Sequence, residues 1–226
     1  MDTLRYKIFS TFIEQDRYLF FLEGLKTTLL LTFAGFLLGT AFGVLLCMAV
    51  RSRYPALRRA AGLVRSLFLE IPTMVLLMIL VYIIFGSSAL GIIWVVTIGL
   101  TLKAGAYLSQ IFGSALDTVE GGEVEAARTL GMSRWQAFRY VALPQTVTAA
   151  LPLYRNQFIA TMHETSVVGY LAIVDLTKAA SIVASRTLDA FFGLITITLI
   201  YFLIGGAVKL LFRLLLARRR EGGEPA

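Results

Sequence analysis

Two charged side chains, Lys103 and Glu164, stand in stretches that are otherwise rich in apolar residues. Glu164 shares one helical face with Gln157 and Thr161, because the three follow an i, i+4, i+7 spacing. A charged side chain in hydrocarbon costs about 2.5–3.5 kcal/mol on insertion scales, so each should face a partner or a wet cavity. Together they could hold a ligand with both signs of charge, its ammonium group at Glu164 and its carboxylate at Lys103. Tyr107, one turn after Lys103, would line the same space.

Two other interpretations of these polar residues remain open. Lys103 and Glu164 could pair with each other and hold two helices together without touching a ligand. His163 could in principle activate Ser166, as in an intramembrane hydrolase, but no second acid–base group or oxyanion element accompanies them.

The chain has one histidine and one cysteine, Cys47, which excludes a multi-histidine metal site and a disulfide framework.

The composition indicates an integral membrane protein. Of the 226 residues, 58% are hydrophobic and 15% are charged, and the mean hydropathy is +0.78, far from a soluble globular domain. The net charge of +7 could suggest nucleic acid. Because the basic residues cluster beside apolar runs, we assign them to lipid headgroups and cytoplasmic loops, and expect no nucleic-acid partner. Charges interrupt the first twenty or so residues, so we expect no cleavable signal peptide.

The apolar stretches predict an all-α protein with five transmembrane helices. The expected spans are residues 27–50, a second stretch from before Ile71 to near Phe85, and residues 92–116, 151–174 and 191–208. Pro72 is expected to kink the second span. Glycines recur at every fourth position of the first span, at Gly35, Gly39 and Gly43. This stripe predicts a close-packing surface for another helix, which we assign to a second chain of this kind, a copy or a paralogue; ordinary glycine enrichment in membrane helices is the alternative.

The charge pattern predicts the organisation of the chain relative to the membrane. Residues 1–22 are expected to form an amphipathic interfacial segment, residues 23–216 the transmembrane domain and residues 217–226 a cytoplasmic tail. Five arginines in residues 51–65 and the basic C-terminus indicate the cytoplasmic side. Five spans then place the N-terminus outside and the C-terminus in the cytoplasm.

A polar interval, residues 120–145, separates the third span from the fourth. Gly131 suits a left-handed helix C-cap, and Ser133 with Gln136 suits a capping box that begins a second helix. Pro144 is expected to limit that helix. The interval therefore predicts two short helices that lie at the membrane surface and offer a rigid knob to a partner, although a solvated loop would also fit.

The residues of this interval resemble the EAA loop of permease subunits of ATP-binding-cassette importers. The matching residues are Glu125, Ala126, Ala127, Gly131, Leu143 and Pro144, while Val141 replaces the usual isoleucine. The resemblance implies that the loop docks on a separate ATPase, with Leu130, Met132, Trp135 and Phe138 as candidate anchors.

Two further stretches resemble the polar amino-acid uptake branch of that family. Residues 102–107 resemble its third-helix pattern, with Lys103 where asparagine is usual, and residues 156–166 resemble its fourth-helix pattern. In the second stretch, Glu164 and Thr165 match, whereas Gln157 and His163 depart from the usual glutamate and lysine. The resemblance implies that Gln157, Glu164 and Thr165 line an amino-acid passage. The changes at Lys103 and Gln157 make the local charge less negative, which favours a neutral or acidic amino acid over a strongly cationic one.

The resemblance implies a type I importer permease in the bacterial plasma (inner) membrane, crossing it several times. The sequence has no phosphate loop, so ATP and Mg would bind to the partner ATPase, expected to be a dimer, and this chain would be a transport subunit rather than an enzyme. The other implied partners are an extracytoplasmic amino-acid-binding protein and a second permease chain, identical or paralogous. A secondary transporter or channel without ATP coupling is the alternative.

Overall fold

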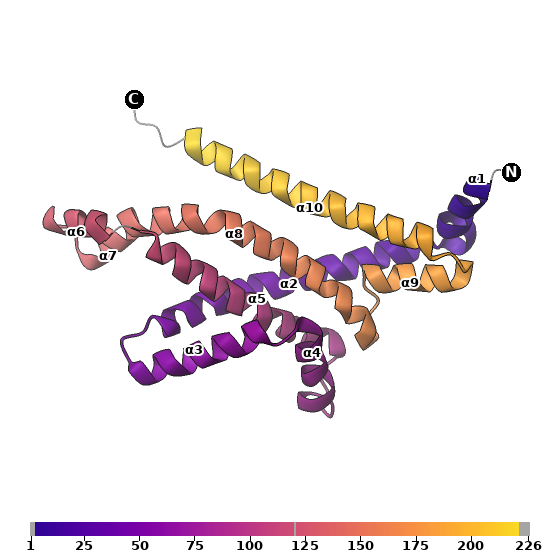
Figure 1. Cartoon of the computed structure of the whole chain (residues 1–226), viewed down its shortest axis with the longest axis horizontal. Coiled ribbons are helices and arrows are strands. Elements are labelled where there is room, and N and C mark those ends of the chain that lie inside the picture. The colour runs from indigo at the N-terminus through magenta and orange to yellow at the C-terminus, as the bar shows by residue number, and fades with distance from the viewer. Residues whose placement is uncertain (1–2, 120, 222–226) are drawn as a thin grey trace.

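The computed structural model of the chain describes residues 3–119 and 121–221 and shows a bundle of long helices (Figure 1). Four helices run along the bundle: α2 (Tyr18–Val50), α5 (Ile92–Asp117), α8 (Leu143–Glu164) and α10 (Ala190–Glu221). By length and composition, α2, α5 and α10 could each cross a membrane, and two bent helix pairs raise the number to five if each pair is one span. The predicted all-helical architecture is confirmed, and the prediction of five spans agrees with the upper number.

The centre of the bundle is the contact between α2 and α5, and the glycine stripe produces it. A Cβ added to Gly39 would lie 2.9 Å from the Cβ of Ala104, and one added to Gly43 would lie 2.9 Å from the Cβ of Leu108. The two backbones approach this closely because the glycines have no side chains. The predicted close-packing surface therefore exists, but its partner is α5 of the same chain. Our assignment of the stripe to a second chain was wrong.

The second apolar stretch is broken rather than kinked. Helix α3 (Pro55–Glu70) and the pair α4 (Thr73–Met78) and η3 (Ile79–Ile84) meet at 108°. Ile71 and Pro72 both have extended backbones, with ψ of 126° and 138°. A residue before proline avoids the helical region, so two successive extended residues turn the chain sharply. As a result, α4 runs across the direction of α3 and packs against α5 through Leu77, while α3 lies along α2 and α5 (Figure 1).

One end of the bundle is closed by short helices. These are α1 (Thr3–Ile8), η1 (Phe9–Ile13), η2 (Glu14–Asp16) and α9 (Leu176–Thr187), which gather at the end opposite α6 and α7 (Figure 1). Within residues 175–186, Leu176, Ala180 and Val183 pack against Phe21 and Ile197 in a buried cluster. The segment is therefore an amphipathic helix that covers the ends of α2 and α10.

An ion pair ties the N-terminal helix to this end. The Nζ of Lys7 lies 2.8 Å from a carboxylate oxygen of Asp189, just before α10. The hydrogen bond from Lys7 holds the pKa of the Asp189 carboxyl below its usual range. Three predicted features include residues outside the described part of the chain: residues 1–2 of the interfacial segment, Glu120 of the coupling loop and residues 222–226 of the cytoplasmic tail.

Candidate functional site

The polar interval forms the two short helices that its sequence predicts, α6 (Gly121–Thr129) and α7 (Arg134–Ala137). Gly131 lies between them with a φ of 91°, a left-handed conformation that favours glycine. The Oγ of Ser133 accepts a hydrogen bond from the backbone of Gln136 at 3.2 Å, and the Oε1 of Gln136 accepts one from the backbone of Ser133 at 2.8 Å. The predicted capping box is therefore present, and it fixes where the second helix begins.

This α6–α7 knob has a buried inner face and an apolar outer face. Ala127 and Ala137 are buried against the rest of the knob, whereas Glu125 and Ala126 are exposed. Leu130 is 84% exposed and Trp135 is 68% exposed. The Trp135 ring lies 5.7 Å from the ring of Phe138, and Met132 is also exposed. Large apolar side chains held in water on a rigid helix pair are typical of a docking surface.

The knob returns to the bundle through a continuous helix, which corrects the prediction for Pro144. A π-helical turn, η4 (Phe138–Ala142), leads directly into α8, and the backbone N–H of Leu143 bonds to the carbonyl of Phe138. Pro144 lies in the first turn of α8 rather than at the end of a helix. A proline in a first turn costs little because its missing N–H would be unpaired there, and the wider turn before it adapts the hydrogen bonding.

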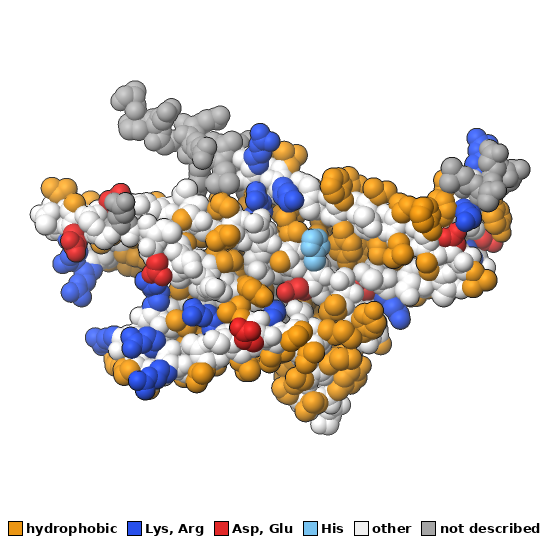
Figure 2. All heavy atoms as spheres, in the orientation of Figure 1, with side chains coloured by type: hydrophobic (Ala, Val, Ile, Leu, Met, Phe, Trp, Pro, Cys, Tyr) orange, Lys and Arg blue, Asp and Glu red, His pale blue; other side chains and the backbone are white. Residues whose placement is uncertain are grey.

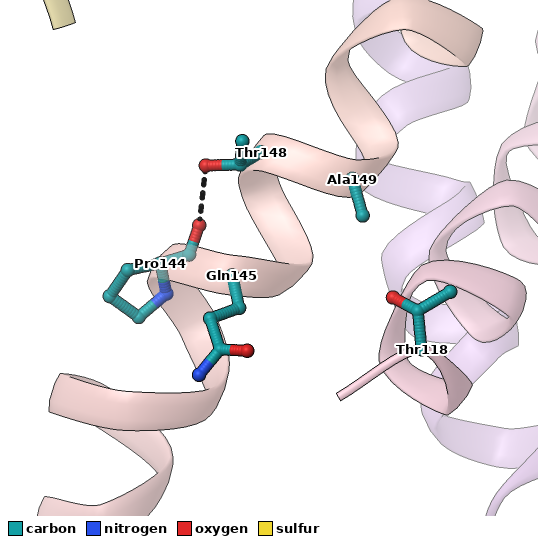
Figure 3. A pocket seen from close by; sticks show the side chains of 5 residues that line it. All are labelled: Thr118, Pro144, Gln145, Thr148 and Ala149. Atoms are coloured by element: carbon teal, nitrogen blue, oxygen red, sulfur yellow. Dashed lines mark hydrogen bonds between the residues drawn. The ribbon is translucent and has the colours of Figure 1, made fainter. Parts of the chain in front are cut away.

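An open surface pocket of about 490 Å³ lies between the start of α8 and the end of α5 (Figure 3). Thr118 lines it from the α5 side, and Pro144, Gln145, Thr148 and Ala149 line it from the α8 side. Thr148 donates a hydrogen bond to the carbonyl of Pro144 at 2.9 Å, and the side chain of Gln145 donates to the carboxylate of Glu123. The second bond joins α6 to α8, so the base of the knob is held from both sides.

Lys103 lies in the middle of α5, and its side chain is only 4% exposed. Its ammonium group donates to three backbone carbonyls at the end of α3: Phe68 at 2.9 Å, Leu69 at 3.0 Å and Ile71 at 2.6 Å. A lysine has three N–H donors, so all of them are used. The same ammonium group lies 5.4 Å from the ring centroid of Tyr107, as the sequence led us to expect for two residues one turn apart.

The predicted fourth-span residues lie on α8, except Thr165, which begins the next helix, η5 (Thr165–Leu171). Gln157, Thr161 and Thr165 are buried, and the Nε2 of Gln157 lies 3.5 Å from the Oγ1 of Thr161. Glu164 is close enough to Lys103 for electrostatic attraction, although none of the ion pairs in the described part of the chain joins them. One carboxylate oxygen of Glu164 is buried and has no hydrogen-bond partner among the described residues. The structure therefore brings Lys103 near Glu164, uses all three donors of the lysine and leaves one carboxylate oxygen of Glu164 without a partner.

A second buried polar group escaped the sequence analysis. Asp175 is fully buried and caps α9 by accepting hydrogen bonds from the backbones of Thr177 at 3.1 Å and Lys178 at 2.9 Å. The Oγ1 of Thr28 on α2 accepts a third bond, from the backbone of Leu176 at 3.1 Å. The aspartate before a helix is a recognisable N-cap signal, but the pairing with Thr28 joins residues 148 apart in sequence.

Comparison with known proteins places most of the chain in one family. Residues 35–221 match the family described as binding-protein-dependent transport system inner membrane component. The probable amino-acid ABC transporter permease protein YckA of Bacillus subtilis is 32% identical over 87% of this chain and 88% of its own length. The histidine/lysine/arginine/ornithine transport system permease protein HisM of Salmonella typhimurium is 35% identical over 51% of this chain and 49% of its own length.

Solved structures agree with this match. A crystal structure of an amino acid ABC transporter with histidines aligns with a TM-score of 0.82 and 29% identity, covering 92% of this chain and 98% of the other. The MetNI methionine ABC transporter, in inward-facing conformations, shares the fold at a TM-score of 0.64 and 22% identity, with 85% and 92% covered. From the extent of the family match and of these alignments, the chain belongs to the family of binding-protein-dependent transport system inner membrane components.

Proposed function

We propose that this chain is the membrane-spanning permease subunit of an ABC importer for amino acids, driven by a separate ATPase that docks on the α6–α7 knob. The observation that carries the coupling step is the exposure of Leu130 and Trp135 on a capped two-helix knob at one end of an apolar bundle. An apolar helix surface of this kind gains its binding energy when a groove covers it. The relatives named as amino-acid permeases support the substrate class.

The charge distribution supports a cytoplasmic position for the knob. Figure 2 shows that Lys and Arg side chains gather at the end of the bundle that carries α6, α7 and the start of α3. The exposed arginines at that end are Arg51, Arg53, Arg58, Arg59, Arg128, Arg134 and Arg139. Basic residues beside spans favour the cytoplasmic side. On this proposal α2 begins outside, and α10 ends in the cytoplasm.

Within the membrane, we place the amino acid beside α8, at Gln157, Thr161, Glu164 and Thr165. The free carboxylate oxygen of Glu164 is suited to accept a hydrogen bond from the ammonium group of the substrate. Lys103 has no donor left for a substrate carboxylate, so its contribution there is to position α3 and α4 and to offset the charge of Glu164. An extracytoplasmic binding protein would deliver the amino acid, and a second permease chain would complete the passage.

The test is reconstitution of the permease with its ATPase and binding protein in liposomes, with a Trp135→Ala variant. We expect the variant to lose most amino-acid uptake and ATPase stimulation, because an aromatic anchor at such an interface contributes about 2 kcal/mol or more. Trp94→Ala is the matched control, because Trp94 is similarly exposed but lies on α5, outside the knob. Uptake that persists without ATP, or equal effects of the two substitutions, would reject the coupling proposal in favour of a secondary transporter or channel.

A further inference from the structure

We propose that a pocket between α2, α3 and α5 binds a phosphate group, either in the headgroup of an anionic phospholipid or as a free phosphate ion. The pocket has a volume of 400 Å³, and its polar lining includes Arg51, Arg65, Gln110, Ser114 and Asp117. It is separate from the Glu164 region and from the α6–α7 knob, which contribute no lining residue.

The two arginines of the pocket are not equally compensated. Arg51 pairs with Asp117, with 2.7 Å between Nη1 and Oδ1. Arg65 is half-buried, yet within the described residues it takes part in no ion pair and no side-chain hydrogen bond. The charged lining residues therefore comprise two cations and one anion, and the uncompensated charge lies on Arg65.

The remaining polar groups of the pocket are suited to the oxygens of a phosphate. Gln110, Ser114 and Asp117 follow an i, i+4, i+7 spacing and share one face of α5. Like Arg65, the amide of Gln110 and the hydroxyl of Ser114 make no hydrogen bond to another described residue. A guanidinium fork with nearby neutral donors matches the geometry of a phosphate, which offers only acceptors. Asp117 would repel an anion on its own, but Arg51 already neutralises it.

The position of the pocket suits a ligand that comes from the membrane surface. It lies where α2 ends at Val50 and α5 ends at Asp117, the end of the bundle that also carries the knob (Figure 1). Cys47 and Val50 form an apolar wall, and Leu45 and Met48 on the same helix are exposed. These apolar side chains would contact the acyl chains of a phospholipid whose phosphate binds Arg65. The assignment of this end to the inner leaflet rests on the proposed function, but the phosphate chemistry does not.

The test measures retention of phosphatidylglycerol by the purified transporter complex in native mass spectrometry, with Arg65→Gln as the variant. We expect about tenfold less retained phosphatidylglycerol, the effect of losing one charge-assisted hydrogen bond. Arg59→Gln is the control, because Arg59 is exposed on the same helix and does not line the pocket. A second arm measures binding of radiolabelled inorganic phosphate by equilibrium dialysis of the same complexes in neutral-lipid nanodiscs.

A fall that is confined to phosphatidylglycerol identifies a lipid headgroup, and a fall that is confined to inorganic phosphate identifies the free ion. Equal binding by the wild type and Arg65→Gln in both arms overturns the proposal, as does an equal fall in Arg59→Gln. If Arg65→Gln does not assemble, Ser114→Ala and Gln110→Ala take its place, because they remove neutral donors from the same pocket. We expect each of these to weaken retention, and unchanged retention in both overturns the proposal. None of these readouts depends on amino-acid transport.

Discussion

The ammonium group of Lys103 donates a hydrogen bond of 2.6 Å to the backbone carbonyl of Ile71, which lies in the break between α3 and α4. The break itself creates the acceptors, because the last carbonyls of a helix have no intrahelical donors. Lys103 satisfies those of Phe68 and Leu69 as well, and its positive charge lies at the negative end of the α3 dipole. One buried lysine thereby joins α5 to a helix that proline has broken.

Replacing Lys103 by methionine should destabilise the permease. The substitution keeps a long apolar stem but leaves buried carbonyls without a donor, at about 1–3 kcal/mol for each group that water cannot reach. We expect the unfolding midpoint of the detergent-purified complex to fall by about 5–10 °C in a thermal scan. Lys26→Met is the control, because Lys26 is exposed on α2. Equal midpoints for the two variants would show that Lys103 does not hold the break together.

The close contact between α2 and α5 gives a second prediction. In a Gly39→Val variant, the new Cβ would lie 2.9 Å from the Cβ of Ala104, so the helices must move apart. Overpacking of this kind costs about 1–3 kcal/mol, and we expect a lower unfolding midpoint and weaker assembly. Gly206→Val on α10 is the matched control, since nothing lies within 4 Å of a Cβ at that position. A Gly39→Val protein as stable as the control would contradict the packing argument.

The features that the sequence predicted correctly depend on short-range chemistry. The capping box of Ser133 and Gln136 and the left-handed Gly131 follow from residues three to five positions apart, and local backbone preferences decide them. The glycine stripe was visible for the same reason, because a four-residue spacing marks one face of a helix. The partner of that face depends on tertiary structure, and we assigned it to the wrong helix.

The features that the sequence did not reveal depend on contacts between distant segments. Pro72 indicated a disturbance of the helix, but the 108° angle depends on how α4 and α5 pack. Lys103 was correctly singled out as costly, yet its partners are backbone carbonyls 32 to 35 residues away, which no side-chain pattern could indicate.

Glu164 gives a prediction in which stability and function change in opposite directions. Glu164→Gln removes a buried carboxylate oxygen that has no partner, while three backbone carbonyls still accept hydrogen bonds from Lys103, so the unfolding midpoint should stay the same or rise. If Glu164 binds the ammonium group of the substrate, KM for uptake should rise about tenfold or more, because a charge-assisted hydrogen bond contributes about 1.5–3 kcal/mol. Uptake kinetics in liposomes measure this, with His163→Gln as the exposed neighbouring control. An unchanged KM in Glu164→Gln would remove Glu164 from the substrate site.

Substitutions of Gly131 test whether the α6–α7 knob couples ATP hydrolysis to transport. Gly131 has a φ of 91°, and nothing lies within 4 Å of a Cβ at this position, so a Gly131→Val substitution acts only through the backbone. A β-branched residue in the left-handed backbone region costs about 1–2 kcal/mol. To relieve this strain, we expect the turn to change shape, which tilts α7 and moves Trp135 away from the groove of the ATPase. We expect reduced uptake per ATP hydrolysed, with an intermediate value for Gly131→Asn, since asparagine tolerates left-handed backbone better.

Gly122→Val is the control, because Gly122 also has free space around it but lies in a right-handed helix. Coupling ratios that are the same in Gly131→Val, Gly122→Val and the wild type would mean that the shape of the knob does not matter for transport.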